Sequence, residues 1–246
     1  MTKEKKIMAL AEEHIMNTYR RTPIALVKGE GARVWDANGK EYLDFVAGIA
    51  VCNLGHSHPQ VVKAIKKQSK NLMHVSNLYY TKPQGEVAEF LTGHSFADKV
   101  FFCNSGAEAN EAAIKLARKY AHENLGADKF ELITMKDSFH GRTMATITAT
   151  GQEKFQFGFT PLLDGFQYVG FNDPAALEKA ISPKTCGVML EPIQGEGGVI
   201  IPDPRYLALV REICNRHKIL MILDEVQTGI GRTWKLFAYE DSGIQP

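Results

Sequence analysis

The chain has 246 residues, of which 44% are hydrophobic and 23% charged, a composition typical of a folded globular protein. Its 29 Lys and Arg residues against 28 Asp and Glu residues leave a net charge of +1, so no global field attracts nucleic acid or membrane. Four dispersed cysteines form no CxxC pair, and the N-terminus has neither a signal-type apolar core nor an acid-poor transit pattern. We therefore expect a cytoplasmic protein without a structural zinc site.

The first 50 residues predict a small N-terminal segment. Residues 3–18 are amphipathic and typical of a helix. Between residues 23 and 45 two β-rich pieces, IALVKGEGARVW and KEYLDF, flank the turn-forming pair Asn38-Gly39. We expect a helix followed by an antiparallel β meander in residues 1–50, and a major domain in residues 51–246.

The rest of the chain predicts an α/β fold. Two helices are expected first, in QVVKAIKKQSKNL after His58-Pro59 and from Pro83 through Leu91. From residue 98 on, apolar runs alternate with helical patterns; the runs are KVFFC, FELITM, FQYVGF, CGVML and ILMIL. This alternation is typical of βαβ units, and it predicts a mostly parallel sheet with helices on both faces.

A first candidate site follows the run KVFFC. Ser105 and Glu108 form a capping box, which predicts a helix that starts here with free backbone N–H groups. Gly106 would let an anion such as phosphate approach that helix end. Taken alone, the pattern fits an ordinary capped helix better than a phosphate site. No dinucleotide fingerprint or GxxxxGK[ST] loop is present.

A second candidate site is Asp224, which follows five consecutive apolar residues. Ligands of open parallel sheets bind beyond the carboxyl ends of the strands, where Asp224 is expected. A buried carboxylate needs donors or a cation, so a protonated ligand nitrogen is a reasonable partner. Capping of the following turn by Asp224 or Glu225 explains the pattern equally well.

Two further loops contain side chains suited to chemistry. In the loop 138–143, Phe139 could cover a flat ring and Arg142 could bind a carboxylate, although a core Phe and a solvated Arg explain it more simply. His140 is a weak candidate base because no paired acid is visible nearby. The loop EPIQGEGG, residues 191–198, has two carboxylates and three glycines, which indicates close backbone approach to a ligand. We expect no metal site, since His56-Ser57-His58 lacks an acidic partner.

Together these loops resemble a known family. The chain is similar to the class III, fold-type I, pyridoxal-phosphate-dependent aminotransferases, within them most to the subfamily that acts on N-acetylornithine. The matching stretches cover nearly the whole chain from Tyr19 onward: KGEGARVWDANGKEYLDFVAGIAVCNLGHSHP, SNLYYTKPQ, SFADKVFFCNSGAEANEAAIKLARKYA, SFHGRT, EPIQGEGGV and LDEVQTGIGRT. One departure is Trp234, where the family pattern after GRT favours a small residue.

The resemblance implies roles for individual residues toward pyridoxal 5′-phosphate and the substrate. Ser105, Gly106 and Ala107 would bind the cofactor phosphate, and Phe139 would stack on the ring. Asp224 would pair with the protonated ring nitrogen and Gln227 would reach the ring hydroxyl, with Glu225 and Val226 in the same loop. Arg142 would bind a substrate carboxylate near Tyr19, and Glu196 resembles the family's gatekeeping glutamate.

The implied activity is transfer of an amino group from N-acetylornithine to 2-oxoglutarate, a step of arginine biosynthesis, by a homodimer. Ornithine, succinylated diamino acids and 4-aminobutyrate are alternative donors within the family, and a non-catalytic cofactor-binding protein is the alternative of another class. The family's catalytic lysine lies beyond the residue that matches Pro246. We therefore assign no catalytic residue and expect the 246-residue chain to bind the cofactor weakly and turn over little.

Overall fold

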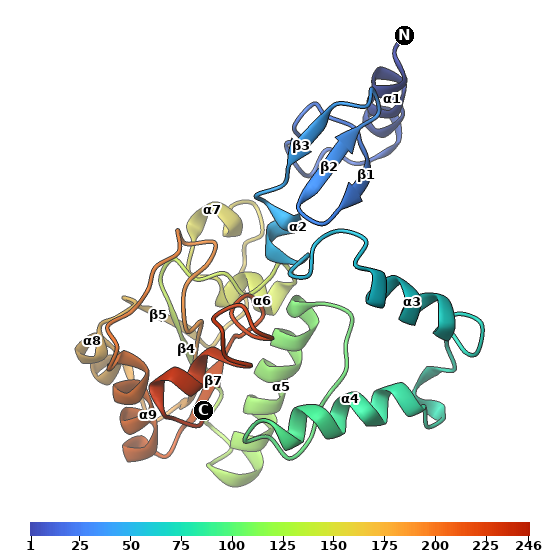
Figure 1. The fold of residues 1–246 in the computed structure, drawn as a ribbon. Coiled ribbons are helices and arrows are strands. Elements are labelled where there is room, and N and C mark those ends of the chain that lie inside the picture. Colours follow the sequence, from blue (N-terminus) through green and yellow to red (C-terminus); the bar gives the residue numbers. More distant parts are fainter. The chain divides into compact units, whose positions relative to one another are not determined.

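A computed structural model describes residues 1–246, which form two compact units, Met1–Tyr80 and Thr81–Pro246 (Figure 1). Each unit is described by itself, and the expected domain boundary at residue 50 stays a prediction. None of the helices combines the length and the apolar character needed to cross a membrane.

The first unit contains the expected helix and meander. Helix α1 spans Lys3–His14, and strands β1 (Leu26–Glu30), β2 (Arg33–Asp36) and β3 (Glu41–Leu43) form an antiparallel sheet in the order β1-β2-β3. The Asn38-Gly39 turn lies between β2 and β3, with Gly39 at a φ of 88°. The remaining elements are α2 (Ala47–Ala50), α3 (Pro59–Gln68) and the 3₁₀ helix η1 (Ser76–Leu78).

The second unit contains a four-stranded parallel sheet in the order β5-β4-β6-β7. The strands are β4 (Glu131–Met135), β5 (Phe166–Val169), β6 (Thr185–Leu190) and β7 (Leu220–Leu223). The helices are α4 (Lys82–Gly93), α5 (Gly106–Asn124), α6 (Met144–Ala149), α7 (Glu153–Gln156), α8 (Pro174–Ala180), α9 (Tyr206–His217) and the 3₁₀ helix η2 (Ala238–Ser242). The expected α/β class is confirmed.

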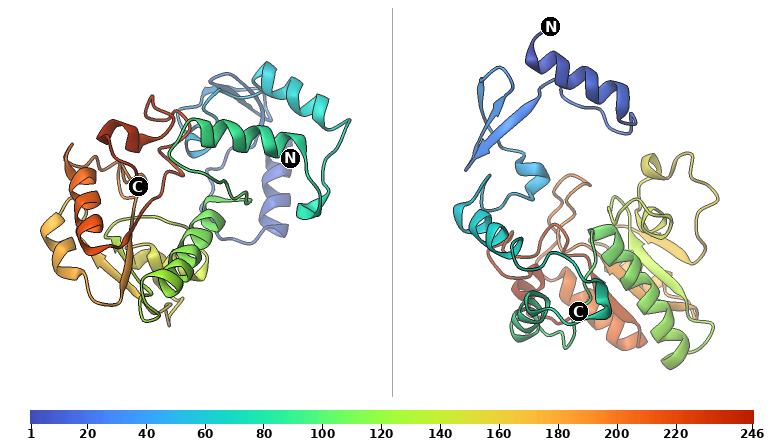
Figure 2. Two further views of the ribbon diagram at one scale, coloured as in Figure 1. Left: turned by 90° about the horizontal axis from the view of Figure 1, so that it is seen from below. Right: turned by 90° about the vertical axis from the view of Figure 1, so that its right-hand side faces the viewer.

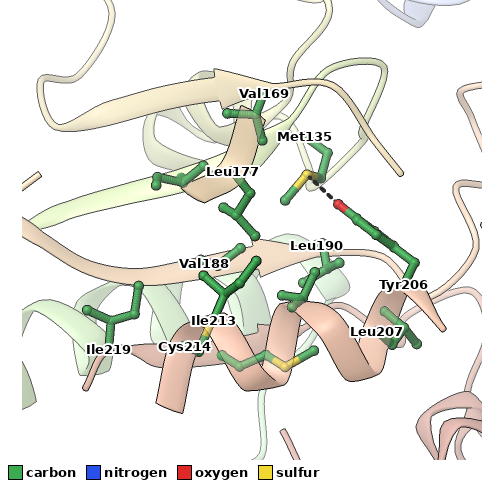
Figure 3. Close-up of a cluster of buried hydrophobic side chains, with 13 residues drawn as sticks. Met135, Val169, Leu177, Val188, Leu190, Tyr206, Leu207, Ile213, Cys214 and Ile219 are labelled. Atoms are coloured by element: carbon green, nitrogen blue, oxygen red, sulfur yellow. Dashed lines mark hydrogen bonds between the residues drawn. The ribbon is translucent and has the colours of Figure 1, made fainter. Parts of the chain in front are cut away.

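Two apolar cores cover the two faces of this sheet, because successive strand residues point to opposite sides. Ile133 and Met135 of β4 join the core beneath α8 and α9, which is shown in Figure 3. Leu132 joins the other core, with Ile114 and Ala117 of α5. Helices α5 and α9 accordingly lie on opposite sides of the sheet, and Figure 2 shows them from two further directions. Because both faces of the sheet are buried, the sequences of its strands are continuous apolar runs instead of alternating apolar and polar residues.

The expected strand at residues 99–103 is wrong. This segment precedes α5 without forming a strand, and Phe101 and Phe102 are 72% and 40% exposed. An apolar run becomes a strand only when a neighbouring strand accepts its hydrogen bonds, and none of the seven strands pairs with this one. Helices α1 and α3 also end earlier than expected, at His14 and Gln68.

Replacing Trp234 by glycine should stabilise the protein. Trp234 is 98% exposed and has a φ of 71°, so its indole contributes almost no burial while its backbone is left-handed. Relief of this conformation should raise the free energy of unfolding by about 1 kcal/mol. Urea unfolding measures the change.

Phe157→Gly is the matched control, because Phe157 is 88% exposed at an ordinary φ of −55°. This control should lose stability through the added freedom of the unfolded chain. A loss of the same size in Trp234→Gly would contradict the assigned strain.

Candidate functional site

Three strands of the second unit deliver the candidate residues to one edge of the sheet. The loop that carries Phe139 follows β4, Glu191 follows β6 and Asp224 follows β7. These strands are parallel neighbours, so their carboxyl ends meet at the same edge. The geometry brings together three of the four stretches that the sequence singled out, and helix α5 adds the fourth.

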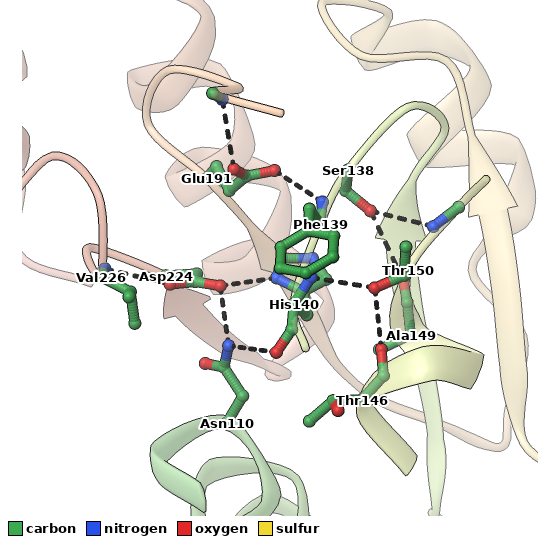
Figure 4. Close-up of polar contacts among 12 residues, drawn as sticks. Asn110, Ser138, Phe139, His140, Thr146, Ala149, Thr150, Glu191, Asp224 and Val226 are labelled. Atoms are coloured by element: carbon green, nitrogen blue, oxygen red, sulfur yellow. Dashed lines mark hydrogen bonds and ion pairs between the residues drawn. The ribbon is translucent and has the colours of Figure 1, made fainter. Parts of the chain in front are cut away.

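Asp224 is a buried carboxylate held by three donors (Figure 4). Its Oδ2 atom accepts a hydrogen bond from Asn110 Nδ2 at 2.8 Å and lies 2.7 Å from His140 Nδ1. Its Oδ1 atom accepts the backbone N–H of Val226 at 3.0 Å. Asp224 is only 5% exposed, so these contacts replace the water that would otherwise stabilise its charge.

His140 and Asn110 belong to the site, although the sequence indicates His140 only as a weak candidate base and no local pattern points to Asn110. His140 is 1% exposed and lies 84 positions from Asp224 along the chain. The Asn110 amide also donates to the carbonyl of His140 at 2.8 Å, which joins the three residues in one network. The acidic partner of His140 is therefore Asp224, which follows a strand that is distant in the sequence. A buried Asn on the apolar face of α5 was the available clue.

Glu191 is a second buried carboxylate, 5% exposed. Its Oε2 atom accepts the backbone N–H of Phe139 at 3.0 Å, and its Oε1 atom accepts that of Gly195 at 3.3 Å. Burial raises the pKa of Glu191 to about 7, although the nearby imidazole of His140 acts in the opposite direction. The group therefore titrates close to neutral pH.

The start of helix α5 has half of the predicted capping box, because the Glu108 side chain bonds the backbone of Asn104 instead of that of the N-cap residue Ser105. The Ser105 side chain accepts the backbone N–H of Glu108 at 3.1 Å, and Glu108 Oε2 accepts the backbone N–H of Asn104 at 2.7 Å. Hydrogen bonds from Asn104 hold the pKa of Glu108 below its ordinary value. The amides of Gly106 and Ala107 lie in the first turn, where a helix offers them no acceptor. They are the groups with which a helix start binds an anion.

Close contacts tie this helix start to the loops from the strands. A Cβ atom at Gly106 would lie 2.7 Å from Val226 Cγ1, so a larger residue there would displace the Val226 side chain of the Asp224 loop. Gly141 has a φ of 133°, and a Cβ there would lie 2.8 Å from the Cβ of Ala107. Glycine at these two positions is what lets the α5 start, the Phe139 loop and the Asp224 loop converge.

Three further residues expected at the site, Arg142, Gln227 and Glu196, lie in the loops at this edge of the sheet. Arg142 is exposed, with its guanidinium carbon 5.9 Å from the Phe139 ring centre and 5.5 Å from that of Phe155. Gln227 lies beside Gly195, and Glu196 is exposed in the same loop.

Two expected residues have other surroundings. The carboxylate of Glu225 accepts the backbone N–H groups of Ala238 and Tyr239, each at 2.9 Å, and so holds the start of η2. Tyr19 is 58% exposed in the first unit. Their roles toward a ligand stay predictions.

The arrangement suits a flat ligand that is anionic at one end and cationic at the other. The α5 start offers backbone donors to an anion, while Asp224 offers a fixed negative charge to a cation. Phe139 is partly exposed and offers a ring face between loops. No group of three or more His, Cys, Asp or Glu side chains has the arrangement of a metal site.

Comparison with protein families and with curated sequences points to the same family of aminotransferases. The family described as aminotransferase class-III matches residues 15–246. The acetylornithine aminotransferase of Caldanaerobacter subterraneus is 58% identical over 235 residues, and that of Nostoc sp. is 56% identical over 238 residues. The alignments cover 96% and 94% of this chain but 60% and 56% of those proteins. The chain thus spans well under two thirds of the length of these relatives.

Solved structures agree with the sequence comparison. The ornithine aminotransferase of Toxoplasma gondii ME49 superposes with a TM-score of 0.95 at 35% identity, over 100% of this chain and 59% of that one. The N-acetylornithine aminotransferase of Stenotrophomonas maltophilia superposes with a TM-score of 0.81 at 42% identity, over 97% and 59%.

Removing the Asn110 amide should destabilise the second unit. Asn110→Ala leaves Asp224 with one donor fewer and the His140 carbonyl without its partner. The loss of these buried hydrogen bonds should lower the free energy of unfolding by about 1–3 kcal/mol. Asn124→Ala, in the exposed last turn of the same helix, is the control for helix propensity and should be close to neutral. Equal stability of the two variants would rule out an energetic role for the network.

Glu191→Gln should change how stability depends on pH. A carboxyl whose pKa is raised in the native state binds a proton that the unfolded chain releases. The stabilising contribution of the wild-type carboxyl is therefore complete below the ordinary Glu pKa and is lost as pH rises through about 7. The free energy of unfolding of Glu191→Gln minus that of wild type should therefore rise by up to about 3 kcal/mol between pH 4.5 and pH 7.5. Above pH 7.5 this difference should change little.

Urea unfolding across this pH range tests the linkage, with the exposed Glu153→Gln as control. Unfolding free energies of wild type and Glu191→Gln that run parallel with pH would show that Glu191 does not titrate as its burial implies.

Proposed function

Because the chain belongs to the aminotransferase class-III family, we propose that the protein transfers the amino group of N-acetylornithine to 2-oxoglutarate. The cofactor of this family is pyridoxal 5′-phosphate, whose ring withdraws electrons from the carbon atom that loses its proton. The observation that carries the proposal is the buried Asp224, held by Asn110 and His140 at the end of β7. An acid in that position fits a ligand with a protonated ring nitrogen.

The cofactor-binding residues act by position and charge. The backbone amides at the start of α5, with Ser105, Gly106 and Ala107, bind the phosphate. Asp224 holds the proton on the ring nitrogen, and His140 and Asn110 hold Asp224 in place. Phe139 covers one face of the ring, and Gln227 reaches the ring hydroxyl. The Val226 side chain lies against Gly106, which supports a narrow slot for the ring.

The substrate-binding residues are those with exposed charges at the same edge. Arg142 binds a substrate carboxylate, since a guanidinium offers two parallel donors to a carboxylate. Its position beside the Phe139 and Phe155 rings supports this role, because the rings hold the guanidinium next to Phe139, the residue that would cover the cofactor ring. Glu196 acts as a gate toward a second substrate, and Tyr19 is a further substrate-binding residue.

N-acetylornithine is the preferred donor in this proposal because relatives named for acetylornithine are 50–58% identical to the chain. The protein would then serve arginine biosynthesis. Ornithine is the second candidate, supported by the superposition on the Toxoplasma ornithine aminotransferase. Glutamate formation from 2-oxoglutarate, measured on the full-length gene product with each donor at equal concentration, separates them. Faster turnover of ornithine than of N-acetylornithine would overturn the assigned donor.

A homodimer in the cytoplasm completes the proposal. Several apolar side chains of the first unit are exposed, among them Phe45 at 93% and Val51 at 79%. Exposed apolar groups of this kind support a protein partner, here a second copy. Sedimentation equilibrium would measure its stoichiometry.

Asp224→Asn should weaken cofactor binding. Pyridoxamine 5′-phosphate is the suitable probe, because it has the phosphate, ring nitrogen and hydroxyl but no aldehyde to react with surface lysines. Loss of the charge partner should raise its Kd by about 10–100-fold, the range of a charge-assisted hydrogen bond of ~1.5–3 kcal/mol. Calorimetric titration of the 246-residue chain measures the affinity.

Asp164→Asn is the matched control, since Asp164 is exposed and only its backbone carbonyl is engaged, by Arg118 at 2.7 Å. An unchanged Kd in Asp224→Asn would refute Asp224 as the partner of the ring nitrogen.

A further inference from the structure

A buried side chain at the start of one of the two loops that border the predicted ring position binds its own loop and also reaches the other loop. The first loop, residues 136–143, follows β4 and carries Phe139; the second, residues 191–199, follows β6 and carries Glu196. The Glu191 side chain accepts two backbone hydrogen bonds, from Phe139 N–H to Oε2 and from Gly195 N–H to Oε1 (Figure 4). A single carboxylate thus spans the two loops.

The loops also meet farther from Phe139. The Gln194 side chain, 1% exposed, donates from Nε2 to the carbonyl of Lys136 at 2.8 Å. A Cβ atom at Gly197 would collide with the carbonyl of Asp137, so the two backbones are in close contact there. The second loop thus contacts the first at three residues, Lys136, Asp137 and Phe139. The contact at Phe139 is the one made by Glu191.

We propose that Glu191 is a positioning residue that fixes the Phe139 ring and the Glu196 backbone relative to each other, so that the two loops move as one body. The side chain starts directly after β6, an inner strand of the sheet whose six residues are all buried, and so has a rigid base. Phe139 donates the hydrogen bond from its own backbone N–H, and Gly195 directly precedes Glu196. The ring that would cover the cofactor and the carboxylate that would act as gate are each within one residue of the shared anchor.

The chemistry of the group favours a carboxylate at this position. Two backbone N–H groups converge on one side chain from different loops, and a carboxylate has an acceptor oxygen for each. An amide of the same shape has only one acceptor oxygen, and its NH₂ group would face the second N–H. Burial raises the pKa of this carboxyl to about 7, and the two hydrogen bonds reduce that cost only in part.

Hydrogen exchange on the cofactor-free 246-residue chain tests the coupling. In Glu191→Ala, the backbone amides of residues 137–143 and 193–199 should exchange about tenfold faster together, while the strands keep their protection. In Glu191→Gln only one of the two segments should speed up, because one acceptor remains. Glu153→Gln, an exposed acid in the same unit, should change neither.

Three exchange results would overturn the proposal. They are faster exchange of only one segment in Glu191→Ala, faster exchange of neither, and a uniform rise over the whole chain, which would indicate general destabilisation. Should Glu191→Ala fail to fold, the isosteric Glu191→Gln decides, and faster exchange of both segments or of neither in that variant overturns it.

A second measurement reports on the ring and rests on the proposed function. Pyridoxamine 5′-phosphate bound next to Phe139 should show induced circular dichroism, which should weaken in both Glu191 variants together with an about tenfold rise in Kd. Unchanged dichroism and affinity in Glu191→Ala would overturn the positioning role. Failure of the wild-type chain to bind the probe would instead count against the cofactor site, and the exchange experiment would still decide the coupling.

Discussion

The buried charge of Asp224 is the constraint on which the site depends. A carboxylate that is 5% exposed is stable only if fixed donors replace water, and Asp224 obtains them from three different segments. Asn110 comes from helix α5, His140 from the loop after β4, and the Val226 amide from its own turn. Each hydrogen bond to Asp224 also holds in place the segment that carries the donor. The same contacts that stabilise the charge therefore also set the positions of the helix start and the Phe139 loop.

The order of the strands explains why these segments can meet. Strands β4, β6 and β7 lie next to one another and run parallel, so their carboxyl ends form one row. The two faces are occupied by apolar cores, which leaves the row of strand ends as the place where polar side chains can gather without disturbing packing. Glu191 comes from the middle strand of this row and reaches toward the loop of its neighbour. The polar network is thus a consequence of topology as much as of sequence.

Local features of the site could be predicted from the sequence, whereas its long-range contacts could not. The N-cap bond between Ser105 and Glu108 depends on residues three apart, and the structure has it, although the Glu108 side chain bonds the backbone of Asn104 rather than that of Ser105. The buried runs of β4, β6 and β7 are also local patterns. By contrast, 84 positions separate His140 from Asp224, and 114 separate Asn110 from Asp224. Such pairs depend on which strands are neighbours, which apolar periodicity does not encode. The run 99–103 shows the same limit, since a strand needs a partner that no local pattern specifies.

Helix α5 relates the two charged ends of the site to each other. Gly106 opens the helix where an anion would bind, and Asn110, which donates to Asp224, follows four residues later. Residues four apart lie on the same face, and at 1.5 Å per residue the two positions are separated by about 6 Å along the axis. One rigid element therefore carries both the donors for an anion and the support for the acid that would meet a cation. A ligand with these two charges would meet donors and acid at a fixed spacing, and Gly106 and Gly141 are the positions where the loops approach each other closely.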